Sequence, residues 1–160
     1  MCCLFGLIDT ELRFTGKEKS KMFHALASAS EARGTDATGV AYDYSRTLHI
    51  YKRPIPGHKL NFYLRNDTRF AMGHTRMTTQ GIARRNYNNL RKSLHLPRTR
   101  IETDSYIAVQ LIEQKGILNF DSLRYMAELL EGSFTITVLG DDGNLYIVKG
   151  DNPFCLYFFP

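Results

Sequence analysis

The sequence has none of the long apolar runs that would place it in a membrane. Its longest apolar stretches, residues 25–29 and 153–160, fall far short of the roughly 20 residues that span a bilayer. The apolar run after Met1 has no basic residue before it and soon meets Asp9 and Glu11, so it lacks the pattern of a secretory signal. We therefore expect a cytoplasmic protein without a membrane partner.

Cysteine is also scarce, and the three present, Cys2, Cys3 and Cys155, form no Cys-x-x-Cys pair. An odd number without a nearby pair of histidines indicates neither a disulfide framework nor a zinc site. The sequence contains no Gly-x-Gly-x-x-Gly and no phosphate-binding loop. We therefore expect free thiols, no metal site and no cofactor.

The composition is that of a globular chain. Its 160 residues, 43% hydrophobic and 23% charged, predict one domain over residues 1–160. Part of the net charge of +5 comes from a cluster of bases that is either a solvated loop or a site for phosphate or an acidic partner. These bases are Arg84, Arg85, Arg91, Lys92, Arg98 and Arg100. Only Tyr87 accompanies them, so nucleic-acid binding, which usually combines basic with aromatic residues, is disfavoured.

Apolar runs and period-2 alternation predict most of the chain's strands. A buried strand is expected at residues 2–8 and another at 154–159, and a long loop at 80–89. The other expected strands are 40–44 and 47–51, which form a hairpin, 70–77, and the hairpin 134–138 with 145–148.

Helical spacing predicts three helices between these groups of strands. The first, over residues 17–31, has an inward stripe of Met22, Phe23, Leu26, Ala27 and Ser30. The second runs over 104–114 with Thr103 as its cap, and the third follows a cap at Asn119 or Asp121 and ends at Gly132. Strands outnumber helices without alternating with them, which favours an α+β fold with antiparallel sheet packed under helices.

Cys2 follows the initiator methionine, and removal of Met1 would leave a free amine and a thiol on one residue. The α-amine titrates at about 7.7 to 8.0 and an unperturbed thiol at about 8.5, so proton transfer between them is matched near neutral pH. N-terminal cysteine and threonine nucleophiles use this arrangement. Taken alone, a cysteine at this position is more often an inert core thiol.

Four further segments give this cysteine a context. They are Arg33-Gly34-Thr35-Asp36-Ala37-Thr38-Gly39, Gly73-His74-Thr75-Arg76-Met77-Thr78-Thr79-Gln80-Gly81, Arg85-Asn86-Tyr87-Asn88-Asn89 and Glu102-Thr103-Asp104-Ser105. In this order, and with the cysteine at position 2, they resemble the class II glutamine amidotransferases over nearly the whole chain. The resemblance implies the four-layer αββα sandwich of N-terminal-nucleophile hydrolases, with mainly antiparallel sheets.

The resemblance also implies roles for individual residues. Cys2 would attack the side-chain amide of glutamine, with its own amine as general base, to give a γ-glutamyl thioester and ammonia. Arg76 would bind the α-carboxylate of glutamine with help from backbone at Met77 and Thr79, and a guanidinium fork suits a carboxylate. Asp104 would take the α-ammonium group.

Three residues are expected to support this site rather than to react. Arg33 and Asp36 would hold the Cys2 strand or form a structural ion pair. His74 is expected to be an internal hydrogen-bonding residue beside Arg76, because Cys2 already carries a base.

One part of the family pattern is missing from the sequence. No Asn-Gly dipeptide occurs, and Asn88-Asn89 runs directly into Leu90, where the family has a strand ending in His-Asn-Gly. The usual oxyanion donors therefore have no match, and loss of one donor can cost on the order of 10²- to 10³-fold in turnover. Either the segment near 89–90 is deleted or it is absent from this sequence, and Asn88 and Asn89 are the nearby amides that could substitute.

These features leave two functions open. One is a glutaminase, which carries out the hydrolase or transferase half reaction that releases ammonia. The ammonia acceptor would then lie on a synthase subunit or on a C-terminal domain beyond residue 160. We expect the natural chain to continue there. The other is an inactive domain of the same fold that binds an amino acid or a protein partner.

Overall fold

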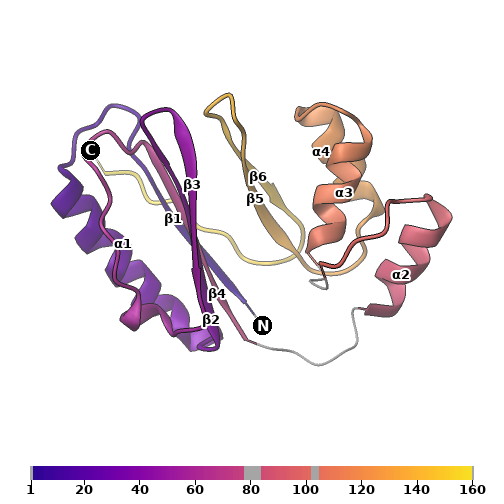
Figure 1. Ribbon diagram of the computed structural model, residues 1–160, viewed down its shortest axis with the longest axis horizontal. Helices are drawn as coiled ribbons and strands as arrows, with labels where there is room; N and C mark the ends of the chain where they lie inside the picture. The colour runs from indigo at the N-terminus through magenta and orange to yellow at the C-terminus, as the bar shows by residue number, and fades with distance from the viewer. Residues whose placement is uncertain (1, 78–83, 102–104, 160) are drawn as a thin grey trace. The chain divides into compact units, whose positions relative to one another are not determined.

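The computed structural model describes residues 2–77, 84–101 and 105–159, with only the backbone for 84–88. The chain falls into two compact units, one of Met1–Thr79 with Leu139–Leu145 and the other of Gln80–Val138 with Tyr146–Pro160. The described residues form a four-stranded antiparallel sheet, a two-stranded sheet and four α-helices (Figure 1). The expected α+β class with antiparallel sheet is confirmed.

The four-stranded sheet belongs to the first unit and has the order β1-β4-β2-β3. Its strands are β1 (Cys3–Ile8), β4 (Phe70–Arg76), β2 (Ala37–Tyr44) and β3 (Thr47–Arg53), and every neighbouring pair is antiparallel. All four strands were expected from the sequence. β1 is only partly buried, contrary to expectation, because it lies at an edge of the sheet.

The β2–β3 hairpin turns on two residues, Ser45 and Arg46, with φ of 50° and 59°. Two consecutive residues in the left-handed region are the signature of a type I′ turn, whose twist matches that of the strands. This tight turn fixes the register of β3 against β2.

Helix α1 (Gly16–Ser30) covers one face of this sheet (Figure 1). Thr15 and Glu18 form a capping box at its start. Its buried face is Gly16, Lys19, Phe23, Ala27 and Ser30. The expected stripe was therefore partly wrong, since Leu26 is 38% exposed and a lysine lies on the inward face.

The core of the first unit lies between α1 and the sheet. The Phe23 ring lies 4.9 Å from Phe5 of β1 and 5.3 Å from Phe62, centroid to centroid. Other buried members are Ala27, Val40, Leu60, Leu64 and Ala71. Odd-numbered residues of β1 therefore face α1, and even-numbered residues face the opposite side.

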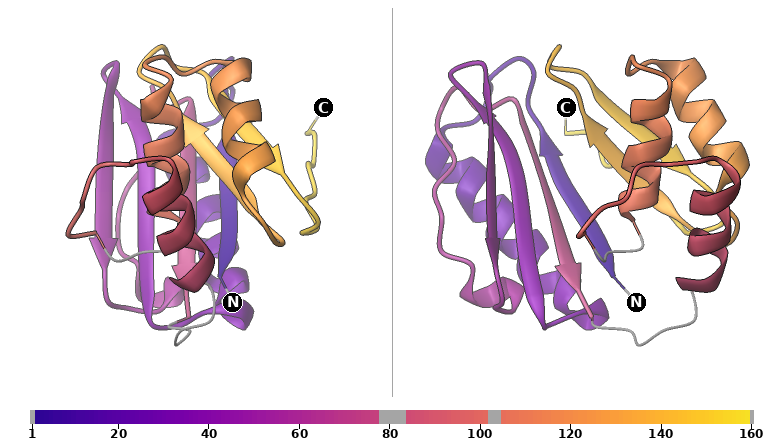
Figure 2. Two further views of the ribbon diagram at one scale, coloured as in Figure 1. Left: turned by 90° about the vertical axis from the view of Figure 1, so that its right-hand side faces the viewer. Right: turned by 45° about the vertical axis from the view of Figure 1, so that its right-hand side comes forward.

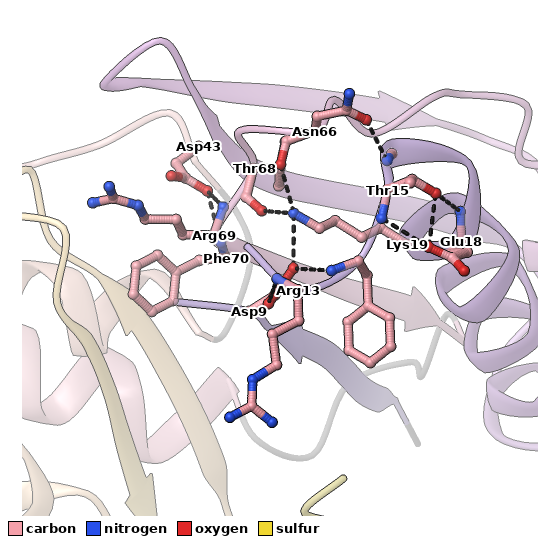
Figure 3. Close-up of polar contacts among 12 residues, drawn as sticks. Asp9, Arg13, Thr15, Glu18, Lys19, Asp43, Asn66, Thr68, Arg69 and Phe70 are labelled. Atoms are coloured by element: carbon pink, nitrogen blue, oxygen red, sulfur yellow. Dashed lines mark hydrogen bonds and ion pairs between the residues drawn. The ribbon is translucent and has the colours of Figure 1, made fainter. Parts of the chain in front are cut away.

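A fully buried ion pair joins α1 to the end of β1. The Lys19 ammonium lies 2.9 Å from Asp9 Oδ2, with side-chain exposures of 0% and 3%. The same ammonium donates to the carbonyl oxygens of Asn66, at 2.8 Å, and Thr68, at 2.6 Å. Figure 3 shows the Lys19 amine at the centre of these contacts.

The Asp9 carboxylate is equally well satisfied. It accepts from the backbone N–H groups of Arg13, at 2.9 Å, and Phe14, at 3.2 Å. Burial by itself would raise the pKa of Asp9, but the hydrogen bonds from Lys19 and the backbone, with the Lys19 charge, hold it below its ordinary value.

The second unit packs helices on a hairpin. It contains α2 (Arg84–Ser93), α3 (Tyr106–Gln114) and α4 (Phe120–Leu129). Asn119 caps α4 as expected. Buried residues of α3, α4 and the loop between α2 and α3 form one core, namely Leu96, Ile107, Ala108, Leu111, Leu123 and Met126. The expected hairpin is present as β5 (Thr135–Leu139) and β6 (Leu145–Lys149), and its apolar side chains join this core.

Two expectations about the second half of the chain change. Residues 84–89, expected in a loop, begin helix α2, while 80–83 and Thr103 lie outside the described residues. Residues 154–159 form no strand, and Tyr157 and Phe158 are 84% and 87% exposed, so the expected buried strand is wrong. An apolar run alone does not make a strand where no neighbouring strand pairs with it.

Within the described ranges, no helix has the length and apolar character needed to cross a membrane.

The buried ion pair gives a first prediction. Lys19→Met leaves the Asp9 carboxylate buried without a counter-charge, so the free energy of unfolding at neutral pH should fall by about 3–5 kcal/mol in urea denaturation. Lys17→Met is the control, because Lys17 is exposed on the same helix, and should change stability by less than about 0.5 kcal/mol.

The loss should also depend on pH. The pKa of Asp9 is lower in the folded than in the unfolded protein, so the ionised carboxylate stabilises the fold. This stabilisation is fully present above the unfolded-state pKa of about 3.9 and is lost as the pH falls through the folded-state pKa. The gap between wild type and Lys19→Met should therefore narrow below about pH 4. A gap that is the same at pH 7 and pH 3 would contradict the pairing.

Candidate functional site

The candidate site is built where β1 begins and β4 ends. The register pairs Cys3 with Thr75 and Leu4 with His74, so one more residue along the strand sets Cys2 opposite Arg76. The backbone N–H of Asp9 donates to the Arg69 carbonyl at 2.7 Å. Antiparallel pairs alternate between hydrogen-bonded and non-hydrogen-bonded, so the odd residues of β1 bond to β4 and the even ones do not.

Continued by this one residue, the register would make Cys2 and Arg76 a non-hydrogen-bonded pair on the sheet face turned away from α1. Directly opposite residues of this kind hold their Cβ atoms about 4.5–5.5 Å apart, closer than in the bonded pairs. Both side chains are exposed. A small molecule held by the guanidinium group of Arg76 would thus lie within reach of the Cys2 sulfur.

The backbone of Cys2 points the other way. Because Cys2 is not a hydrogen-bonded partner of β4, its N–H is directed to the free edge of β1. Removal of Met1, which the sequence predicts, would make this nitrogen a primary amine beside its own thiol. Nothing in the β1–β4 ladder competes for its proton.

The neighbouring Cys3 differs from Cys2 in both position and chemistry. It is half-buried on the face that carries Phe5, and burial raises the pKa of its thiol. The positive charge of Arg33 opposes this rise, and the neighbouring Cys2 adds to it. Cys2 is thus the accessible thiol of the pair, and Arg33 lies close enough to influence this end of β1.

Close backbone packing fixes Arg76. A Cβ added to Gly34 would lie 2.5 Å from the Arg76 carbonyl carbon and 2.7 Å from the Met77 nitrogen. The φ of Gly34 is 171°, so this position needs glycine for space and not for its backbone angle. Next to it, the Asp36 N–H donates to the Arg76 carbonyl at 2.9 Å.

Two threonines of the recognised segments hold the same strands from inside. Thr75 is fully buried and its hydroxyl donates to the Ser30 carbonyl at the end of α1, at 3.0 Å. Thr38, on β2, donates to the Ile55 carbonyl at 2.8 Å. The sequence reasoning gave neither residue a role, although the period-2 pattern around Arg76 already places Thr75 on the opposite, inward face.

The structure brings together some of the expected site residues. Cys2, Arg33, Asp36 and Arg76 gather at one end of the sheet, and Met77, 43% exposed, directly follows Arg76. His74 is half-buried, on the same face as Arg76.

The remaining expected residues lie in the second unit or outside the described residues. Asn89 lies on α2 in the second unit with an exposed side chain, and only the backbone of Asn88 is described. Thr79 and Asp104 lie outside the described residues.

Two hollows in the surface lie elsewhere. Each has a volume of about 330 Å³, and they share Asn66 and Asp67, close to the far end of β1. Both are wide open, and neither is lined by Cys2 or Arg76. Specific ligands are normally enclosed on most of their surface, and neither of these open hollows would enclose one in that way.

In the described part of the chain, no group of three or more His, Cys, Asp or Glu residues is arranged to hold a metal ion.

Comparison of the chain with known protein families finds no matching family, and comparison with curated proteins finds no match. The resemblance to glutamine amidotransferases therefore rests on the sequence segments alone.

The packing of Gly34 gives a second prediction. Gly34→Ala forces the added methyl group into the backbone of Arg76 and Met77, and overpacking of this kind costs about 1–3 kcal/mol of unfolding free energy. Gly39→Ala is the matched control, because its added Cβ would lie 3.6 Å from the nearest Lys52 atom, an ordinary contact. Chemical denaturation of both variants tests this, and equal midpoints would show that the backbone at Gly34 yields freely.

Proposed function

We propose that the protein is a glutamine amidotransferase of class II in which Cys2 is an N-terminal nucleophile. The observation that carries this proposal is the register of β1 and β4, which pairs Cys3 with Thr75 and so brings the adjacent residues Cys2 and Arg76 to the same end of the sheet. In this proposal the thiol and amine of Cys2 act on a substrate whose carboxylate the Arg76 guanidinium group binds.

The chemistry follows from these groups. The α-amine of Cys2 takes the thiol proton, and the sulfur attacks the side-chain carbonyl carbon of glutamine to form a tetrahedral oxyanion. When the oxyanion collapses, the C–N bond breaks and the ammonium group returns its proton to the leaving ammonia. Water then attacks the γ-glutamyl thioester, and the products are glutamate and the free thiol.

In this proposal Arg76 orients the substrate and takes no part in bond making or breaking. Its guanidinium group can hold the α-carboxylate of glutamine by two parallel hydrogen bonds, and the short aliphatic chain of glutamine then carries the amide toward Cys2. In this proposal Asp104 receives the α-ammonium group, and the backbone at Thr79 assists Arg76. The acceptor of the ammonia would be supplied by a partner subunit or a further domain.

The proposed αββα sandwich would cover the sheet face that α1 leaves bare. On that face of β1 and β4, Leu4 and Met72 are half-buried and Ile8 is 47% exposed. Apolar side chains on the second face of a sheet are typical of a sheet that packs against another.

A second candidate function is a non-catalytic domain that binds an amino acid or a partner protein. It is favoured by the absence of the Asn-Gly dipeptide, because the tetrahedral intermediate then lacks its usual donors. The site at Arg76 could still hold an amino-acid carboxylate in such a domain.

A glutamine-like electrophile tests the proposal and separates the two functions. We expect intact-mass analysis to show a chain that begins at Cys2, and a single adduct on Cys2 that excess glutamine prevents. The exposed Cys155 is an internal control, since a small neutral alkylating agent should modify both residues but the glutamine analogue only Cys2. Retention of Met1 in protein that still forms this adduct would overturn the role of the amine.

Turnover should be much weaker than labelling. Without the usual oxyanion donors, ammonia release from glutamine should be slower by on the order of 10²-fold or more than in an intact site. Slow release that Cys2→Ala abolishes would support the enzyme, whereas no adduct at all would support the binding domain.

Arg76→Lys gives a separate prediction. Lysine keeps the charge but loses the fork, so the concentration of glutamine that protects Cys2 should rise by about tenfold or more. The rate of Cys2 modification by a small neutral alkylating agent should stay within about twofold, since the thiol itself is unchanged. Equal loss of both would instead give Arg76 a structural role.

A further inference from the structure

β3 is an edge strand whose outer side has no partner among the described residues (Figure 2). It is seven residues long and contains neither a proline nor a bulge, and the charged residues that can protect an edge, Lys52 and Arg53, lie only at its end. Two apolar side chains are exposed on it, Leu48 at 44% and Ile50 at 63%.

The hairpin register identifies the free backbone groups. Tyr44 and Thr47 close the two-residue turn and form a hydrogen-bonded pair, so alternate pairs along β2 and β3 are bonded. The backbone N–H and C=O groups of Leu48, Ile50 and Lys52 therefore point away from β2. Another extended strand can form hydrogen bonds with all of these free N–H and C=O groups.

We infer that β3 pairs antiparallel with β3 of a second copy of this chain, about a two-fold axis at Ile50. In this register Ile50 opposes Ile50 of the partner copy, and Leu48 opposes Lys52 on each side. All three pairs are of the hydrogen-bonded kind, because every residue in them has its backbone groups on the free edge. Two four-stranded sheets then become one continuous sheet.

Charge favours antiparallel over parallel pairing of the two β3 strands. β3 carries cations at its end, Lys52 and Arg53, and no acidic residue. Antiparallel pairing about Ile50 sets the cationic ends apart, whereas parallel pairing would align them. It also brings Lys52 of each copy beside Leu48 of the other copy. Within its own chain, Leu48 lies opposite the acidic Asp43 of β2.

The other edge of the sheet is a poorer partner. β1 is shorter, contains Gly6 in its middle and begins directly after the proposed nucleophile. Pairing of β1 with β3 of another copy would be head-to-tail and would grow an open chain of molecules rather than a closed dimer. A two-fold β3 contact is closed.

Sedimentation of the whole chain over a range of concentrations tests the inference. We expect a reversible dimer, which Ile50→Pro abolishes, because proline removes an outward N–H but leaves the β2 ladder intact. Ile8→Pro is the matched control on the outward side of β1, and it should leave the dimer unchanged. A protein that stays monomeric at all concentrations, or that loses its dimer with Ile8→Pro and not with Ile50→Pro, would overturn the inference.

The register has its own test at Leu48, whose side chain is 44% exposed and lies opposite Asp43 of β2. Leu48→Glu places a carboxylate opposite Lys52 of the partner copy, and Leu48→Lys places a second cation there. Because the pair occurs twice, we expect the dissociation constant to fall about fivefold with Glu and to rise about fivefold with Lys. Equal effects of the two variants would contradict the register even if a dimer forms.

Discussion

The first unit depends on the buried contact between Lys19 and Asp9. An ammonium group with no exposed surface is costly to bury, and here it is tolerated because a carboxylate and two carbonyl oxygens surround it. The contact joins α1, the residue that follows β1 and the loop that leads into β4. Since the three must meet for the charge to be satisfied, the pair favours one arrangement of the helix on the sheet over its alternatives.

At the other end of the same strands the sheet creates the candidate site. Cys2 reaches Arg76 only because β1 and β4 pair in this register, and because their side chains alternate between two faces. A slip by one residue would turn Cys2 toward α1 and bring Cys3 to the open face. The fit of the Phe5 ring over Gly73, where an added Cβ would collide with it, helps to exclude that slip.

Sequence patterns predicted the first unit well, and predicted best where structure is set locally. Hairpin turn, capping residues and period-2 strands are written in neighbouring residues, so β2, β3, β4 and α1 were expected near their observed bounds. Lys19 was missed because a lysine on an apolar stripe looks solvated until Asp9 and the carbonyl groups of a distant loop surround it. The strand predicted at residues 154–159 was wrong because a strand needs a neighbouring strand to pair with, and an apolar run alone does not specify one.

The candidate site shows the same division between local and distant information. The motif around Arg76 could be read from the sequence, but the need for glycine at Gly34 comes from the backbone of a strand far along the chain. The same holds for reactivity: adjacent Cys2 and Cys3 differ because one faces solvent and the other faces the helix side of the sheet. In the proposed mechanism, a nucleophile at the start of an edge strand has an accessible amine and thiol at once. The donors for the oxyanion must then come from elements outside that strand, and that is the part of the resemblance for which this sequence has no Asn-Gly.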